Sequence, residues 1–358
     1  MKTFKFRLYP RSSAQTQLLQ AIEDSRIIYN ALLDAKKKAW EKGKKKISQF
    51  DAQGIVTRVK KEKGITCSTF LLRFAKDRLF DAYNHFFKKH NKFPRFKGKH
   101  HYSSIGLYAG QYQLEKDRVY IPKIGWIRFR KHRAIEGTPK QIVVKKTPAG
   151  KWFLCIACEG KFSRKLPKTG KQAGIDLGLK DFAVLSDGNK IPRERFFQEE
   201  EENLAKAQQK LEKMKKGSSQ RKKQRLVVAK IHERIANKRS NFAHQKSFQL
   251  VKDYDGIVAE DLSVKQMQED KKKKYLHKSI QDVAWGQFLI LLAYKALSAG
   301  KKVILVNPAY TSQTCSGCGY VQKMELKDRT YSCPQCLLVM DRDLNAAKNI
   351  YRSGAALL

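Results

Sequence analysis

The chain has 358 residues, 41% of them hydrophobic, which is enough apolar material for two or three folded domains and excludes a disordered tail. Its 75 Lys and Arg outnumber 33 Asp and Glu, leaving a formal net charge of +42. Self-repulsion makes this excess costly unless a polyanion is bound, so we expect nucleic acid as the partner, with a membrane surface as the weaker alternative. The longest apolar run, 288–293, is too short to span a bilayer.

The first half of the chain changes from strand to helix patterning and back. Residues 1–10 alternate like a half-buried strand, and residues 11–91 have helical spacing, with a basic turn KKKAWEKGKKK between two helices. Short alternating runs over 92–165 predict a small β-barrel that includes the first strand, with the helices inserted into it. We expect the aromatic residues of the second helix to be core residues, with base-stacking platforms as the alternative: Phe74, Phe80, Phe86 and Phe87.

Residues 166–358 follow a polar linker and predict an α/β domain. Two apolar runs in GIDLGLKDFAVLSDGNKI include a hairpin signal at Asp187-Gly188. Two long charged helices are then joined at 217–219. A strand GIVAE, a helix over 280–297 ended by Gly300, a strand KVILV and a helix over 345–351 complete the domain.

Four cysteines have the spacing of a structural zinc site. They form two Cys-x-x-Cys pairs in Gly- or Pro-containing turns: Cys315, Cys318, Cys333 and Cys336. Four thiolates on two such turns suit tetrahedral Zn²⁺, so we predict one structural zinc in a ribbon over 309–340. Leu337 departs from the pattern, because the first pair is followed by Gly319. A third pair, Cys155 and Cys158, lies in an alternating strand where residues three apart face opposite ways, which favours core packing.

Three carboxylates stand in unusual places. Asp176 interrupts an apolar strand, Glu260 ends another strand, and Asp343 begins the last helix. Neighbouring parallel strands and a helix start can bring such groups together, and converging carboxylates repel one another unless divalent cations lie between them. The set therefore predicts a two-Mg²⁺ site for phosphodiester cleavage.

The sequence resembles the transposon-encoded TnpB proteins, relatives of the type V CRISPR effectors. The motifs that carry the resemblance are Gly174-Ile175-Asp176-Leu177-Gly178, Ala259-Glu260-Asp261-Leu262, Tyr310-Thr311-Ser312-Gln313-Thr314-Cys315 and Asp341-Arg342-Asp343-Leu344-Asn345-Ala346-Ala347, with weaker matches at Pro94-Arg95-Phe96-Lys97 and the helix Ala82 to Lys88. The resemblance implies an RNase H-like, RuvC-type nuclease domain with Asp176, Glu260 and Asp343 as metal ligands and Asp341 as a neighbour or helix cap.

The resemblance also implies partners and domain roles. A guide RNA derived from the transposon end would pair with one strand of a target DNA duplex and displace the other strand, in a prokaryotic cytoplasm and on the nucleoid. The barrel would act as a wedge and the helices as a recognition domain that reads a short adjacent motif. The candidate reading residues, which could equally contact only phosphates, are Arg73, Lys76, Arg78, Tyr102, Ser103 and Ser104.

An RNA-guided DNA endonuclease is thus the main expectation. A guided DNA-binding repressor without cleavage is one alternative, but all three acids are present. A transposase of the same fold is another, and a basic zinc-ribbon protein that only binds RNA is the simplest. Because Asp343 follows Cys336 by seven positions, we also expect the zinc ribbon to help fix where this carboxylate lies.

Overall fold

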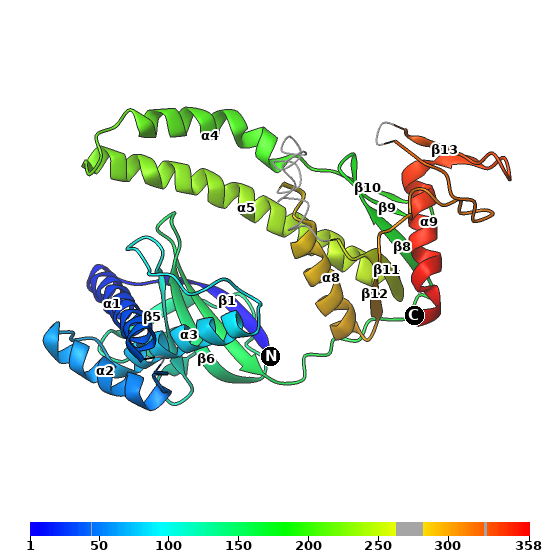
Figure 1. Ribbon diagram of the computed structural model, residues 1–358. Helices are drawn as coiled ribbons and strands as arrows, with labels where there is room; N and C mark the ends of the chain where they lie inside the picture. Colours follow the sequence, from blue (N-terminus) through cyan, green and yellow to red (C-terminus); the bar gives the residue numbers. More distant parts are fainter. Residues whose placement is uncertain (44, 263–281, 326–327) are drawn as a thin grey trace. The chain divides into compact units, whose positions relative to one another are not determined.

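The computed structural model describes residues 1–43, 45–262, 282–325 and 328–358 (Figure 1). The chain divides into two compact units, Met1–Phe162 and Ser163–Leu358, and each has its own hydrophobic core. Within these described ranges, no helix is both long and apolar enough to cross a membrane.

The first unit is built on a seven-stranded antiparallel sheet in the order β2-β6-β7-β1-β5-β4-β3. Its strands are β1 (Lys2–Tyr9), β2 (Ser104–Tyr108), β3 (Gln113–Glu115), β4 (Arg118–Ile121), β5 (Gly125–Arg130), β6 (Thr138–Lys146) and β7 (Trp152–Glu159). The first strand lies between β7 and β5, as predicted. The sheet is a curled half-barrel rather than the closed barrel that we expected, because β2 and the three-residue β3 remain its two edges.

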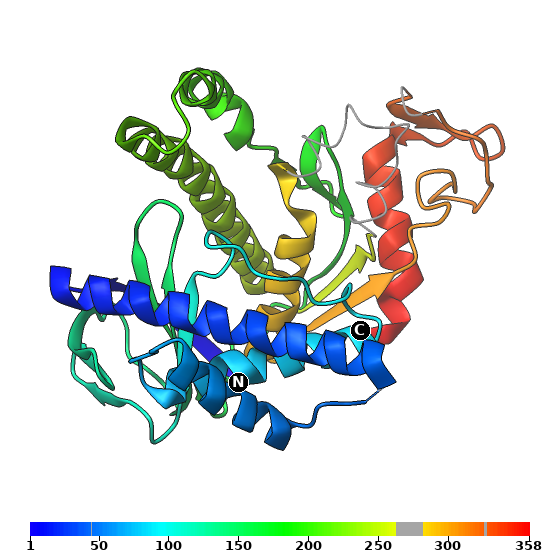
Figure 2. The same cartoon turned by 60° about the vertical axis from the view of Figure 1, so that its left-hand side comes forward.

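The first unit has three helices, where two were predicted: α1 (Ser12–Gly43), α2 (Gln49–Glu62) and α3 (Thr69–Phe87). Helices α1 and α3 pack on the sheet, and α2 packs on these two helices. The long α1 continues through KKKAWEKG, which we expected to be a turn, because its Lys, Ala and Glu residues are good helix formers (Figure 2). The unpredicted α2 begins with a capping box, in which Ser48 and Asp51 each accept a hydrogen bond from the other's backbone N–H.

The second unit contains a five-stranded sheet in the order β10-β9-β8-β11-β12. Its strands are β8 (Gln172–Leu177), β9 (Asp181–Leu185), β10 (Lys190–Pro192), β11 (Gly256–Glu260) and β12 (Lys302–Val306). The strands β8, β11 and β12 are parallel, whereas β9 and β10 form the antiparallel hairpin predicted at Asp187-Gly188, where Gly188 has φ +93°. Two helices, α4 (Phe196–Glu212) and α5 (Ser219–Asp253), pack side by side as the predicted charged hairpin (Figure 2).

Two further helices cover the sheet, α8 (Trp285–Ala299) and α9 (Arg342–Gly354), and the short helix η2 (Ala355–Leu357) follows α9. The predicted start of α8 at residue 280 lies outside the described residues, and Gly300 ends this helix at φ +72°. Helix α9 lies directly on β8 (Figure 1), where a Cβ on Gly174 would come within 2.3 Å of the Ala347 carbonyl oxygen. A small residue at this point of the strand therefore sets how closely α9 approaches the sheet.

Candidate metal centres

Asp176 and Glu260 come from neighbouring parallel strands. Asp176 is half-buried near the end of β8, and Glu260 is the buried last residue of β11. Ala259 of β11 is in register with Ile175 of β8. Glu260 directly follows Ala259, and Asp176 directly follows Ile175. Because residues in register on parallel strands point to the same face, the sheet places both carboxylates on one side.

Asp343 reaches the same region from the first turn of α9. The N-cap of this helix is Asp341, whose Oδ1 accepts hydrogen bonds from the backbone N–H groups of Asp343 (2.9 Å) and Leu344 (3.2 Å). The other oxygen of Asp341 pairs with Lys190 Nζ at 2.9 Å. Asp341 is thus the cap of the helix, and the charge of Asp343 acts on Asp176 more strongly than the charge of Asp341 does.

The three carboxylates interact electrostatically. Burial raises the pKa of Asp176 well above its usual value, and the negative charges of Glu260 and Asp343 raise it further, while Arg342 opposes the shift. Burial likewise raises the pKa of Glu260. Carboxylate oxygens are hard donors, which suit Mg²⁺ better than softer metals. The described residues do not bring these three carboxylates together as a metal-ligand group, since the group of that kind found there is the cysteine cluster described below.

Thr311 and Arg342 each contact one of these acids. Thr311, at the entrance to the cysteine-rich segment, donates a buried hydrogen bond of 2.7 Å from Oγ1 to Glu260 Oε1. Arg342 donates from Nε and Nη2 to Asp343 Oδ1 at 3.3 and 3.1 Å, and from Nη1 to the Glu325 carbonyl at 3.2 Å. Both contacts link the cysteine-rich segment to the carboxylates.

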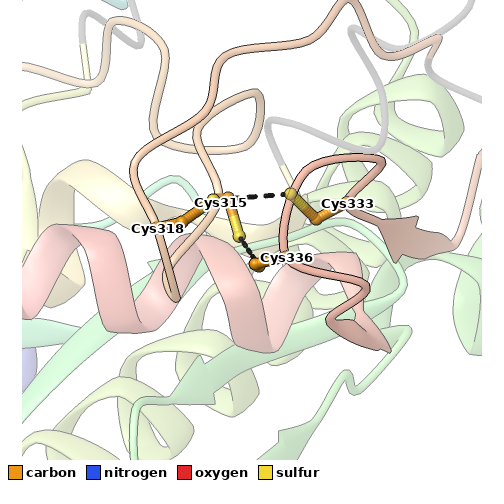
Figure 3. A group of neighbouring side chains, drawn as sticks. All are labelled: Cys315, Cys318, Cys333 and Cys336. Carbon is orange, nitrogen blue, oxygen red and sulfur yellow. Dashed lines mark hydrogen bonds between the residues drawn. The ribbon is translucent and has the colours of Figure 1, made fainter.

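The four predicted cysteines meet in one cluster (Figure 3). Their sulfur atoms all lie within 4.8 Å of one another, and the pairs Cys315–Cys336 and Cys318–Cys333 are 3.5 Å apart. A tetrahedral zinc with Zn–S bonds of about 2.3 Å requires sulfur separations of about 3.8 Å, so the cluster can hold one zinc ion. It is the one such group of His, Cys, Asp or Glu donors found in the described residues.

Leu337 has the left-handed backbone conformation that a glycine, Gly319, has at the equivalent position after the first cysteine pair. Gly319 follows Cys318 with φ +84°, and Leu337 follows Cys336 with φ +59°. In both turns, the residue after the second cysteine of the pair therefore has a positive φ. The replacement of glycine by leucine in the second turn does not change this backbone conformation. A leucine bears a steric cost in this region that glycine does not.

Helix α9 holds the cysteine-rich segment through one polar face. Asn345 donates to the Thr314 carbonyl (2.7 Å) and accepts from the Ser316 N–H (2.8 Å). One turn later, Asn349 donates to the carbonyls of Thr311 (2.9 Å) and Thr314 (2.6 Å). We did not predict these two residues, although their i, i+4 spacing on the last helix is the signal that could have revealed them.

The third cysteine pair does not join the cluster. Cys158 is fully buried and Cys155 half-buried in β7, where the residues alternate between the two faces of the sheet. Core packing, the prediction for this pair, is confirmed for Cys158.

The residues expected to read a DNA motif have mixed environments. Arg73 is exposed, whereas Lys76, Tyr102 and Ser104 are buried and Ser103 is half-buried. Arg78 donates to the carbonyl (3.0 Å) and hydroxyl (3.2 Å) of Ser104, and its guanidinium lies 5.1 Å from the Tyr102 ring centroid. A groove of about 480 Å³ between α2 and α3 is lined by Gln49, Phe50, Gln53, Thr69, Phe70, Arg73 and Lys76.

Three protein-family models match the chain. A "Helix-turn-helix domain" model matches residues 1–45, a "Probable transposase" model, OrfB_IS605, matches 141–281, and a Cas12f1-like TNB domain model matches 285–350. A "Putative RNA-guided DNA endonuclease" of Streptomyces pristinaespiralis is 31% identical, over 99% of this chain and 90% of that protein. The chain belongs to the TnpB/OrfB_IS605 family.

A second relative and two solved structures are also similar to this chain. A "Putative RNA-guided DNA endonuclease InsQ" of Escherichia coli K12 is 30% identical, over 100% of this chain and 93% of that protein. The fold is similar to that of a Cas12f1 chain in a complex with sgRNA and target DNA, with a TM-score of 0.59, 14% identity and 98% of each chain covered. It is also similar to the mini-RNA-guided endonuclease CRISPR-Cas_phi3, with a TM-score of 0.55, 12% identity and coverage of 98% and 92%.

Proposed function

We propose that this TnpB-family protein is an RNA-guided DNA endonuclease that cuts guide-complementary DNA beside a short adjacent motif. The observation that carries the proposal is that β8 and β11 place Asp176 and Glu260 on one side of the sheet, where the charges of Glu260 and of Asp343 from α9 both raise the pKa of Asp176. Two relatives that match 99% and 100% of this chain bear the name "Putative RNA-guided DNA endonuclease". A net charge of +42 suits an RNA and a DNA partner together.

The three acids would act as ligands for two Mg²⁺ ions. When bound, the ions supply Lewis-acid stabilisation to the attacking water and to the leaving oxygen of the phosphodiester. The chain's own contribution is to hold the carboxylates: the sheet register aligns Asp176 with Glu260, Thr311 orients Glu260, and the cap at Asp341 together with Arg342 orients Asp343.

The domain roles follow from the same proposal. The sheet order β10-β9-β8-β11-β12, with three parallel strands and an antiparallel hairpin, supports an RNase H-like, RuvC-type domain over 166–358 with the zinc ribbon at 309–340. Residues 1–10 and 92–165 would form the wedge and residues 11–91 the recognition domain. In that domain, the groove with the exposed Arg73 and two glutamine amides is the best-suited reader of base edges.

The test begins with the RNA that co-purifies with the protein, which is sequenced to design a matched target. The complex is then given Mg²⁺ and a plasmid library with randomised flanks. We expect cleavage next to one motif. Asp176→Asn should keep RNA binding and lose cleavage, and the matched control Asp261→Asn should still cut, because Asp261 is exposed beside Glu260.

The outcomes separate the alternatives. A wild-type complex that binds its target but never nicks it would favour a guided repressor, and strand-transfer products would favour a transposase. Cleavage by the Asp176→Asn protein at the wild-type rate would show that the three carboxylates do not take part in the reaction.

A further inference from the structure

An exposed aromatic surface lies at the end of α3 and in the loop that follows. Phe87, Phe93 and Phe96 expose 71%, 41% and 51% of their area. Phe87 stacks on the buried Tyr83 with centroids 6.1 Å apart, and Phe93 meets Tyr83 edge-on at 5.5 Å. The prediction that Phe87 is a core residue is therefore wrong. We call Phe87, Phe93 and Phe96 the aromatic platform.

The backbone under the platform is held in place. Lys97 is fixed to α1 at both backbone groups: its N–H donates to Asn30 Oδ1 at 2.8 Å, and its carbonyl accepts from Asn30 Nδ2 and Arg26 Nη1, each at 3.0 Å. The turn after α3 is fixed by the hydrogen bond from the Lys89 N–H to the Phe86 carbonyl at 2.9 Å. The chain thus holds apolar rings toward solvent, although burying a phenylalanine would stabilise the fold by roughly 1.5–3 kcal/mol.

The charge around the platform indicates what binds there. Residues 88–101 contain six lysines and arginines and no acidic residue: Lys88, Lys89, Lys92, Arg95, Lys97 and Lys99. Lys37 of α1 also lies over the Phe96 ring, 5.5 Å from its centroid. An apolar protein partner would not require this charge, whereas a nucleic acid supplies phosphates for the cations and base faces for the rings.

We infer that the aromatic platform binds unpaired bases of the guide RNA. Duplex bases are already stacked on one another, so open ring faces suit a single-stranded segment, and sequence-tolerant stacking on aromatic side chains is how proteins commonly hold RNA loops. The inference rests on the proposed function, because it takes the RNA from it. It adds a binding site outside both candidate metal centres.

The test uses the full-length protein and three fluorescent probes: a single-stranded RNA, a single-stranded DNA of the same sequence, and the RNA as a closed hairpin duplex. We expect Phe87→Ala and Phe96→Ala each to weaken binding of the single-stranded RNA by about tenfold and binding of the hairpin much less. Phe87→Leu, which keeps the apolar area but not the ring face, should also weaken binding. Tyr294→Ala, at an exposed aromatic residue of α8, is the control and should bind as the wild type does.

The salt dependence distinguishes stacking from charge. The phenylalanine variants should lower affinity without changing the slope of log K against log salt, whereas Lys92→Gln should make the slope shallower. If the wild type and the double variant Phe87→Ala/Phe96→Ala bind single-stranded RNA with equal affinity, the platform does not bind RNA. That result would leave the proposal of guided cleavage intact. Weaker binding of DNA but not of RNA would assign the platform to the displaced strand instead and overturn the RNA assignment. Failure of the wild type to bind RNA at all would overturn the proposed function itself.

Discussion

The Thr311 hydroxyl donates to Glu260 at 2.7 Å, and the Thr311 carbonyl accepts from Asn349 of α9 at 2.9 Å. One residue at the entrance of the proposed zinc ribbon therefore contacts a proposed metal ligand and also the helix whose first turn contains another, Asp343. At the exit of the ribbon, Arg342 contacts Asp343 and the Glu325 carbonyl. The ribbon is thus connected to two of the three carboxylates by hydrogen bonds.

Loss of the Thr311 hydroxyl should weaken the metal site without unfolding the protein. Thr311→Val keeps the side-chain shape but leaves the buried Glu260 without its donor, and we expect cleavage to fall by about 10- to 100-fold, with a higher half-saturating Mg²⁺ concentration. Thr311→Ser, which retains the hydroxyl, should cut at close to the wild-type rate. Mg²⁺ titrations of the cleavage rate, with melting temperatures measured alongside, check this, and equal Mg²⁺ dependence in Val and Ser variants would contradict it.

Removal of a zinc ligand should uncouple the ribbon from the carboxylates. We expect metal analysis to find one zinc per wild-type chain and none in Cys333→Ser, because Cys333 supplies one of the four sulfur donors in the cluster of the described residues. The variant should bind RNA and lose most of its cleavage. Cys155→Ser, in β7 and outside the cluster, is the matched control and should retain both zinc and cleavage. A zinc-free Cys333→Ser protein that cuts normally would refute the coupling.

Relief of the strained residue in the second cysteine turn should stabilise the ribbon. Leu337 is exposed and has φ +59°, so Leu337→Gly should increase the stability of this turn by about 1 kcal/mol. We expect slower zinc release to a chelator and a higher melting temperature. Gly319→Ala, at the equivalent turn with φ +84°, should have the opposite sign. Faster zinc release from Leu337→Gly would show that the leucine side chain itself supports the turn.

The lowered pKa of Asp255 predicts that the protein loses part of its stability over a defined range of acidic pH. Burial opposes its ionisation, but Lys301 Nζ at 3.0 Å and the N–H groups of Gly170 and Thr169 at 2.7 and 2.8 Å outweigh burial and lower its pKa to about 2. Because the folded pKa lies below the unfolded value of about 3.9, the stabilisation is present above about pH 4 and is lost as the pH falls toward 2.

Urea unfolding of Asp255→Asn between pH 7 and pH 2 tests this. The variant should lose about 2 kcal/mol at pH 7, and the difference from wild type should shrink below pH 4 and vanish near pH 2. Asp253→Asn, at an acid that bonds to Gln249 on its own helix, serves as the control and should show a much smaller difference. A pH-independent difference for Asp255→Asn would mean that packing rather than charge holds this junction.

Some parts of the structure could be predicted because neighbouring residues in the sequence indicate them. Period-two alternation located the strands, the Asp187-Gly188 pair located a hairpin, and cysteine spacing located the sulfur cluster. The continuation of α1 and the additional α2 were missed although their signals are local: helix-forming residues in KKKAWEKG and the capping box of Ser48 and Asp51. The open edges of the first sheet were missed because strand pairing depends on distant segments. The charge of Arg78 similarly suggested a contact with nucleic acid. In the structure its guanidinium donates hydrogen bonds to Ser104, which lies 26 residues away in the sequence.

The sequence by itself determined the chemistry available to this protein: a large positive charge, four thiols with metal spacing, and three acids in apolar or helix-start positions. Tertiary structure decided which of these groups act together. Parallel register aligns Asp176 with Glu260, and close packing at Gly174 brings α9 onto their sheet. It also decided that Phe87 faces solvent while Lys76 does not. Residue type sets charge and donor properties, whereas proximity and burial depend on contacts between distant segments, which the linear order does not contain.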